Sequence, residues 1–447
     1  MPTAPATQTA TGAGLRWMEG LRYGLLGLPL AFVALPLYVL LPNYYARNFG
    51  VPLAGLGALL LGARLMDAVS DPLLGRWADA LFARSHASVL ACGAAAALLL
   101  GASFGALFFP PSTALPFLWL WAGACLVLCY LAFSALTILH QSWGALLGGD
   151  ALGRSRVVAF REGLGLLGVV LASLSPVIFG MPTTVALLGL ALVLGCWAWS
   201  QSPRPMLQAP VEAARTAAQD GGLLAPWRVP AFRALLAVFM VNGIATALPA
   251  TLILFFVQDR LQAPPAMEAW FLGSYFVAAA LALAPWLRVV KRWGLERAWL
   301  AGMLLAVAVF AFAAQLGAGD TKAFLAVCVL SGMAMAADLA LPGALLAGVI
   351  AGQTAGAGGD GTRLDADARS GPGASGRFFG WWNLATKLNL AMAAGLALPL
   401  LASFGYAPGS RSAEGLQALA WAYCLLPCAL KLLAAGLLYF LLLRKSP

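Results

Sequence analysis

The chain has 447 residues, of which 62% are hydrophobic and 10% are charged, and its formal net charge is +10. About 25% of the residues in an ordinary soluble domain are charged, so this chain is too poor in charge to cover a water-facing surface. Lipid is therefore expected to be its solvent. The excess of Lys and Arg does not indicate a nucleic-acid partner, because these residues lie in short segments between apolar stretches.

Residues 1–15 are rich in Ala, Thr and Gly and are predicted to be disordered. A helix needs about 20 apolar residues to cross a bilayer. The N-terminal half, 16–201, has such segments near 21–45, 52–80, 88–109, 115–147, 156–179 and 183–201. A polar linker, 202–229, leads to the C-terminal half, 230–447, with segments near 230–259, 268–290, 297–316, 322–352, 377–404 and 414–443. We therefore predict an all-α membrane protein with twelve transmembrane helices in two six-helix halves.

The distribution of the 27 Lys and Arg residues predicts the orientation of these helices. Most of them lie in segments that face the cytoplasm when both termini are inside, including the linker and the Gly-rich loop 353–375. Cytoplasmic loops carry an excess of Lys and Arg, so we predict an N-in/C-in topology with 353–375 as a flexible cytoplasmic loop. The expected location is the cell membrane, as a multi-pass protein of a bacterial inner membrane.

The second predicted helix contains an unusual group of charges in the sequence GARLMDAVSDP. Arg64, Asp67 and Asp71 are spaced by three and four residues, which places them on one face of a helix. Charges inside a span cost about 2.5–3.5 kcal/mol each on insertion scales and usually mark a transport pathway. Asp67, Ser70 and Asp71 are candidate cation ligands for Na⁺, or a proton site. A permanently neutralised ion network is the alternative.

Other polar side chains within the predicted spans are candidates for binding a solute. Besides Arg64, they are Thr137, His140, Gln141 and Trp143 in the fourth helix, Arg161 in the fifth, Asn242 in the seventh, and Trp382 and Lys387 in the eleventh. A mixture of hydrogen-bond donors and aromatic rings suits a polar organic ligand. His140 is equally compatible with a hydrogen-bonded core position, and Asn242 with a bond between helices.

Lys387 lies about 15 Å deep in its helix and needs a partner. The candidates are Asp338 in the tenth helix and the two aspartates of the second helix. Lys431, alone in the twelfth helix, is interpreted as structural. Glu162 is assigned with Asp338 and Lys387 to a charge network. Because Glu162 and Arg161 are adjacent in sequence, they are expected to point in different directions and not to neutralise each other.

No catalytic constellation is recognised: the sequence has no HExxH and no phosphate-binding loop, and it has two histidines. We therefore predict that the protein is not an enzyme and needs no cofactor beyond a coupling ion, Na⁺ or H⁺. A lipid-modifying membrane enzyme is disfavoured for the same reason. A scaffold or receptor that transports nothing remains a third possibility.

Three motifs resemble those of the glycoside–pentoside–hexuronide:cation symporters, the melibiose-permease branch of the major facilitator superfamily. They are RLMDAVSDPLLGRWAD in the second helix, RSRVVAFREG at the start of the fifth, and NLATKLNLA in the eleventh. The resemblance implies cation-binding positions at Asp67, Ser70 and Asp71, and a substrate-site arginine at Arg161. It also implies that Lys387 links the substrate and cation sites.

The sequence departs from this family in the residues that hold sugar. The first helix has no carboxylate, Gly348 and Ala351 stand where many relatives carry aspartates, and the fourth helix reads LHQSWG. We therefore predict a cation-coupled symporter for a small organic solute, such as a sugar or glycoside. A lysolipid-like or other amphipathic substrate is the alternative. The expected partners are this small molecule and membrane lipid, and the expected state is a monomer.

Overall fold

The computed structural model describes residues 16–444 except 51–52, 112–116, 206–221, 265, 356–374, 407–408 and 410–411. Most of the linker and of the loop predicted at 353–375 lie outside the described residues, as does the segment 1–15. The described part of the chain is helical and contains no strand. This all-α architecture agrees with the prediction from hydropathy.

The first predicted span is interrupted rather than continuous. It runs as α1 (Trp17–Gly24), α2 (Gly27–Leu35), a π-helical turn η1 (Pro36–Leu40) and α3 (Leu41–Phe49). Pro36 begins the π-helical turn and Pro42 follows it. Because proline has no backbone N–H, each of them removes one helical hydrogen bond and permits the change in winding.

The rest of the N-terminal half consists of α4 (Leu53–Phe82), α5 (His86–Phe108), α6 (Leu118–Leu146) and α7 (Ala151–Ser200). α7 contains two spans that meet at Gly180, whose φ of 80° lies in the left-handed region open to glycine. Pro176 and Pro182 flank this kink. The break coincides with the predicted gap between the fifth and sixth helices, 179–183.

The C-terminal half repeats the pattern. It contains a short 3₁₀ helix η3 (Ala225–Arg228), then α9 (Pro230–Phe255) with the π-helical turn η4 (Phe256–Arg260), α10 (Ala266–Trp293) and α11 (Leu295–Ala313). α12 (Thr321–Ala355) and α14 (Ser375–Ser403) follow. The last span comprises α15 (Ala413–Ala420), η6 (Trp421–Leu425), α16 (Leu426–Leu438) and η7 (Tyr439–Leu443).

Among the described residues, nine helices are long and apolar enough to cross a membrane. The interrupted first span, α4 and α14 complete an arrangement that is consistent with twelve spans. Large apolar side chains remain exposed along these helices, for example Leu120 and Leu281. In water this surface would be unfavourable, whereas lipid solvates it, so the protein is a multi-pass membrane protein.

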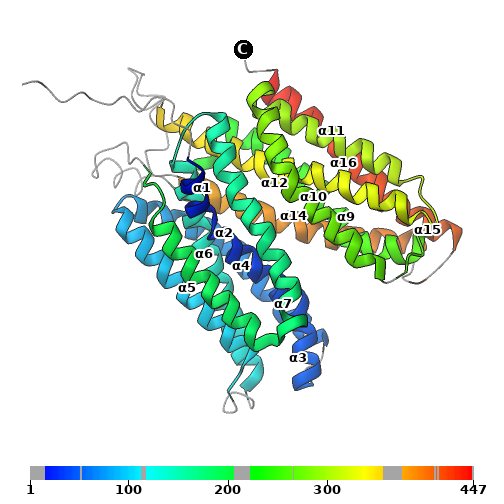
Figure 1. The fold of residues 1–447 in the computed structure, drawn as a ribbon, viewed down its shortest axis with the longest axis horizontal. Helices are drawn as coiled ribbons and strands as arrows, with labels where there is room; N and C mark the ends of the chain where they lie inside the picture. Colours follow the sequence, from blue (N-terminus) through cyan, green and yellow to red (C-terminus); the bar gives the residue numbers. More distant parts are fainter. Residues whose placement is uncertain are drawn as a thin grey trace, which may run out of the picture.

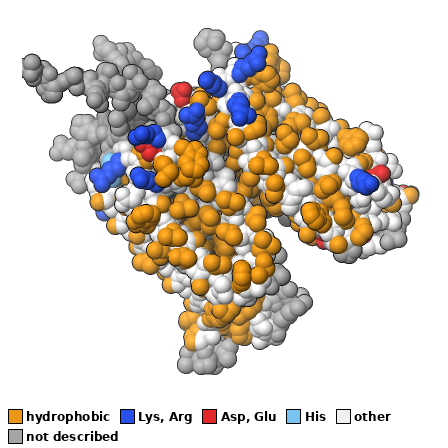
Figure 2. Space-filling model, in the orientation of Figure 1, with side chains coloured by type: hydrophobic (Ala, Val, Ile, Leu, Met, Phe, Trp, Pro, Cys, Tyr) orange, Lys and Arg blue, Asp and Glu red, His pale blue; other side chains and the backbone are white. Residues whose placement is uncertain are grey.

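The two halves form two bundles, which Figure 1 shows meeting along α4, α7 and α14. α4 packs against α14, and α7 packs against α10 and α12. We call the end where α7 ends and α9 begins the linker end, and the opposite end, with α3 and α15, the far end. The bundles diverge towards the far end, where Figure 2 shows the surface hollowed between them.

Candidate functional site

The charged face of α4 lies at the junction between the halves. Asp67 and Asp71 are buried, with 1% and 0% of their surface exposed. They are one helical turn apart and so share a face. The Ser70 hydroxyl donates to the backbone carbonyl of Asp67 at 2.8 Å, so in this state it is engaged on its own helix.

Lys387 reaches this pair from α14, in the other half of the molecule. Its Nζ lies 2.7 Å from Asp67 Oδ2 and 2.8 Å from Asp71 Oδ2. The same ammonium donates to Ser134 Oγ on α6 at 2.9 Å, and Ser134 in turn donates to Asp67 Oδ1 at 2.7 Å. The structure therefore gives Lys387 the second-helix aspartates as partners and not Asp338. Ser134 is a further member of this cluster that was not predicted from the sequence.

Close contact between the backbones of α4 and α14 makes this pairing possible. A Cβ atom added to Gly380 would lie 2.5 Å from the backbone oxygen of Asp71. Gly75 and Gly376 approach each other in the same way, with a backbone oxygen of each where a Cβ of the other would stand. Residues larger than glycine at these positions would separate the two helices and withdraw Lys387 from the carboxylates.

A second ion pair joins the same two helices at the linker end. Asp79 of α4 and Arg377 of α14 are both buried, and Arg377 Nε lies 2.8 Å from Asp79 Oδ2. The Asp79 carboxylate also accepts the backbone N–H groups of Gly376 and Arg377, at 2.6 and 3.1 Å. These two N–H groups belong to the first turn of α14, where unsatisfied donors favour an anion.

The sequence contained a signal for this second pair. Asp67, Asp71, Gly75 and Asp79 follow one another at intervals of four, which places them along a single stripe of α4. Neither Asp79 nor Arg377 is among the candidate residues predicted from the sequence. The structure shows that the stripe continues to the end of the helix and is covered by α14 over its whole length.

Some predicted solute-binding residues surround the same junction. Gln141 of α6 accepts a hydrogen bond from Asn383 of α14, with 3.0 Å between Oε1 and Nδ2, so this contact also crosses between the halves. Trp382 stacks on Phe239 with ring centroids 3.8 Å apart. The buried Thr137 hydroxyl has no hydrogen-bond partner among the described residues. Arg64 is half-buried on α4.

Two predicted ligands lie instead within the core of the N-terminal half. His140 is fully buried, its Nε2 is 2.8 Å from the Tyr23 carbonyl oxygen, and its ring stacks on Tyr23. Trp143 is also fully buried and donates to the Pro203 carbonyl at 3.0 Å. Both side chains are used in packing α6 against its neighbours, which corrects their assignment to a solute-binding surface.

Arg161 and Glu162 also behave differently from expectation. They form an ion pair, with Arg161 Nε 3.0 Å from Glu162 Oε1. Adjacent residues start in different directions, but these two side chains are long enough to fold back towards each other. Their side chains are 15% and 24% exposed. The prediction that they do not neutralise each other is therefore wrong.

The C-terminal half contains its own buried ion pair, which corrects two further predictions. Lys431 of α16 is not alone: its Nζ lies 2.7 Å from Asp338 Oδ2 on α12. Asn242 and Thr246 of α9 accept from the same ammonium at 2.9 and 3.1 Å. Trp299 of α11 and Asn242 donate to Asp338 Oδ1 at 2.9 and 3.0 Å. Asp338 is thus satisfied without Lys387.

The two charge clusters differ in net charge and in whether their residues come from one half of the molecule or from both. One carboxylate and one ammonium make the Asp338–Lys431 pair neutral, and all its partners belong to the C-terminal half. The cluster around Lys387 has two carboxylates for one ammonium, and it connects the halves. Among the described residues, no group of three or more His, Cys, Asp and Glu is placed to hold a metal ion.

Three solved structures with a fold similar to that of this chain are structures of transporters or of transporter homologues. The bacterial homologue of the iron transporter ferroportin, in an outward-facing state, gives a TM-score of 0.66 at 16% identity, covering 96% of this chain and 99% of that chain. The E. coli fucose:proton symporter FucP gives 0.62 at 15% identity, covering 93% and 97%. The proton:xylose symporter XylE gives 0.61 at 13% identity, covering 96% and 94%.

No curated protein matches the chain. The sequence pattern of the family described as MFS/sugar transport protein does match, over residues 22–445. This match covers nearly the whole chain, and the similar folds are those of major facilitator transporters. The chain is therefore a membrane transporter that belongs to the MFS/sugar transport family of the major facilitator superfamily.

Proposed function

We propose that this transporter is a cation-coupled symporter, driven by Na⁺ or H⁺, and that it carries a small organic solute by alternating access. The observation that supports the proposal is the position of Lys387, an ammonium of one half bound by two buried carboxylates of the other. A bond between halves has to break when the halves rock against each other. Another cation then has to bind the two carboxylates in place of the Lys387 ammonium.

The coupling step follows from the charges. While Lys387 is in place, its ammonium offsets one of the two negative charges of Asp67 and Asp71. When α14 moves away, both carboxylates lose the ammonium of Lys387, and removing one member of a buried ion pair costs about 3–5 kcal/mol. A Na⁺ ion or a proton at these carboxylates offsets this cost. Ion binding and the movement of Lys387 are thereby linked, and such linkage is reciprocal.

The Asp79–Arg377 pair fixes the closed side of the transporter. It holds α4 against α14 at the linker end, whereas the halves are open at the far end. With the proposed N-in/C-in topology, the linker end is cytoplasmic and the opening faces outwards. Solute and cation then enter from outside, and their release inside requires both inter-half ion pairs to open.

For the solute, we propose a sugar or glycoside, in line with the resemblance of three sequence motifs to the melibiose-permease branch. Gln141 and Asn383 place amide groups at the junction of the halves, beside the aromatic pair of Trp382 and Phe239. Amides and a flat ring are groups that orient polar solutes in largely apolar sites. We further propose a monomer in a bacterial inner membrane as the working form.

The test uses purified protein in proteoliposomes, with uptake of a panel of labelled sugars and lysolipids under an inward Na⁺ or pH gradient. The wild type should accumulate one solute class with one of the two ions. Asp71→Asn should abolish this accumulation and leave downhill exchange partly active, whereas Asp320→Asn, on the exposed far surface, should change neither. Undiminished gradient-driven accumulation by Asp71→Asn would remove Asp71 from the coupling site.

A further inference from the structure

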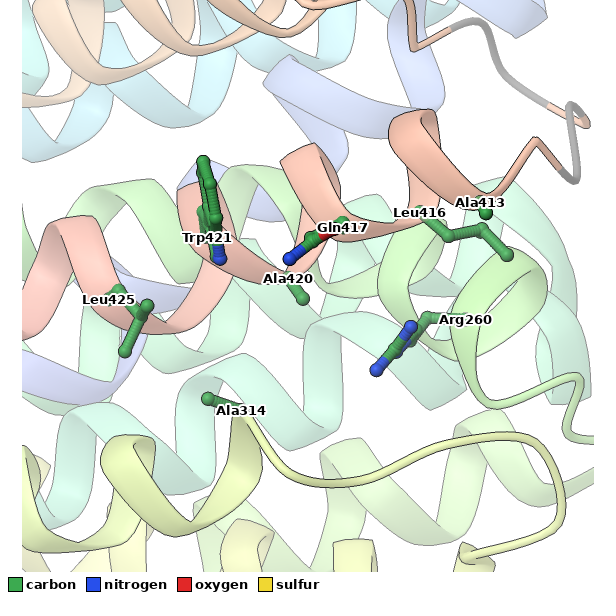
Figure 3. A pocket seen from close by; sticks show the side chains of 8 residues that line it. All are labelled: Arg260, Ala314, Ala413, Leu416, Gln417, Ala420, Trp421 and Leu425. Carbon is green, nitrogen blue, oxygen red and sulfur yellow. The ribbon is translucent and has the colours of Figure 1, made fainter.

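A pocket of about 530 Å³ opens on the C-terminal half, away from the junction between the halves. It lies at the far end, between the ends of α9 and α11 and the start of the last span. Figure 3 shows the Arg260 side chain extending into the space between the helix that bears Gln417 and the helix that ends near Ala314. The other lining residues are Ala413, Leu416, Ala420, Trp421 and Leu425.

The polar end of the pocket presents a positive charge. Arg260 Nε donates to the carbonyl of Leu316 at 3.0 Å, which fixes the guanidinium in place and leaves its outer nitrogens towards the pocket. The neighbouring Asp259 is engaged elsewhere, because its carboxylate accepts the Tyr406 hydroxyl at 2.5 Å and the Gly409 N–H at 3.1 Å. Within the described ranges, Arg260 has no acidic side chain within 4.0 Å.

The remaining wall of the pocket is apolar and faces outwards. Trp421 is 54% exposed and Leu425 is 43% exposed, as expected for side chains in contact with lipid. From Gln417 to Leu425 the last span rises about 12 Å, at roughly 1.5 Å per residue. The pocket thus has a polar end, formed by the Arg260 guanidinium and the Gln417 amide. An apolar strip follows it, and this strip is long enough to hold part of an acyl chain.

The polar end and the apolar wall of the pocket each include residues of a π-helical turn. η4 (Phe256–Arg260) ends with the arginine, and η6 (Trp421–Leu425) contains both exposed apolar side chains. A π-helical turn widens a helix, gives up regular hydrogen bonds and is frequent at functional sites. Both irregular turns of this region therefore contribute side chains to the same pocket.

We propose that this pocket binds a phospholipid from the surrounding bilayer. Its phosphodiester contacts the Arg260 guanidinium and the Gln417 amide, and one acyl chain lies along Leu416, Ala420, Trp421 and Leu425. A guanidinium offers two parallel donors that match phosphate oxygens, and interfacial tryptophan is typical of the headgroup level. This site is separate from the transport pathway, so it does not depend on the proposed function.

The experiment measures thermal unfolding of the full-length protein in detergent, with dioleoyl phosphatidylglycerol as the probe. The wild type should be stabilised in a concentration-dependent way, because a ligand that binds only the folded state raises its stability. Arg260→Ala should lose at least half of this shift, and so should Trp421→Ala. Lys322→Ala removes a positive charge from the same end, outside the pocket, and Trp270→Ala removes an exposed tryptophan of α10. Both controls should retain the shift.

Dioleoylglycerol, which lacks the phosphate, and inorganic phosphate, which lacks the chains, should each leave the melting temperature unchanged. Native mass spectrometry provides a second reading that does not depend on the stability of the variants. The wild type should retain a phosphatidylglycerol adduct that Arg260→Ala loses. Equal lipid shifts and adducts in Arg260→Ala, Trp421→Ala and the two controls would overturn the proposal. A full shift with inorganic phosphate alone would also overturn it, by identifying a site for the free ion.

Discussion

Lys387 of α14 lies with its Nζ 2.8 Å from Asp71 Oδ2 of α4, so this ion pair spans the two halves of the transporter. Asp67 and Ser134 complete the environment of this ammonium. The pair lies between the open far end and the closed linker end of the junction. Its position makes the neutralisation of these carboxylates by Lys387 depend on how the halves are arranged.

We expect Lys387→Ala to stop gradient-driven transport while the protein still folds. Without the ammonium, Asp67 and Asp71 are left buried with no cation, and proton uptake by one carboxylate relieves the penalty. Size-exclusion chromatography checks the fold, and proteoliposome uptake checks transport. Wild-type accumulation by this variant would show that Lys387 has no part in coupling.

Crosslinking tests the same contact directly. Lys387→Cys combined with Asp71→Cys should react with a short bifunctional thiol reagent and lock the halves. Lys387→Cys combined with Asp338→Cys should not react, because Asp338 lies with Lys431 instead. The reverse pattern would mean that Lys387 pairs within its own half.

The Asp79–Arg377 pair predicts a gate at the linker end. Arg377→Ala leaves a buried carboxylate and should weaken closure of this end, by about 3–5 kcal/mol if the pair is lost outright. Thr137→Cys, at a half-buried position of α6, serves as the reporter. Its labelling by an impermeant maleimide from the linker side should increase in the Arg377→Ala background.

Arg76→Ala is the matched control for this gate, because Arg76 is exposed on the same helix. It should leave the labelling of Thr137→Cys unchanged. Adding Asp79→Ala to Arg377→Ala removes the uncompensated charge and should recover part of the lost thermal stability. Equal labelling in the Arg377→Ala and Arg76→Ala backgrounds would exclude the gate.

The helical spans and the need of Lys387 for an acidic partner could be predicted because both follow from general costs. Apolar length determines a span, and a deep lysine requires an acidic partner. The residues alone left both Asp338 and the two aspartates of α4 open as that partner, and the resemblance to the symporter family favoured the aspartates. The N-in/C-in topology remains a prediction, and so does the identity of the solute. The packing of the described helices determines neither of them.

The Asp338–Lys431 pair could not be predicted in this way. The two residues are 93 positions apart, and their contact depends on how α12 and α16 are rotated within the bundle. Nothing in the local sequence of either helix specifies that rotation. His140 and Trp143 illustrate the same limit, because their helix presents them to the core of the N-terminal half and not to the junction.

The Lys431 pair should stabilise the C-terminal half without taking part in coupling. Lys431→Met leaves Asp338 uncompensated and should lower the melting temperature strongly, since breaking a buried pair costs about 3–5 kcal/mol. Lys431→Met with Asp338→Leu should be more stable than either single variant and should still transport. Loss of transport by this double variant with a retained fold would place the pair in the transport mechanism.

Glycine contacts allow the backbones of α4 and α14 to touch. In an ordinary helix, Gly→Ala stabilises by up to about 1 kcal/mol, because alanine is the better helix former. At Gly380 the new Cβ would lie 2.5 Å from the Asp71 backbone oxygen, so Gly380→Ala should instead force the helices apart. Gly62→Ala is the control within α4, since no atom lies within 4 Å of its added Cβ. Thermal unfolding should show a loss for Gly380→Ala and no loss for Gly62→Ala, and crosslinking of Lys387→Cys to Asp71→Cys should fall only with the former. If both glycine variants behave alike in both measurements, close contact of these backbones is not what holds Lys387 in place.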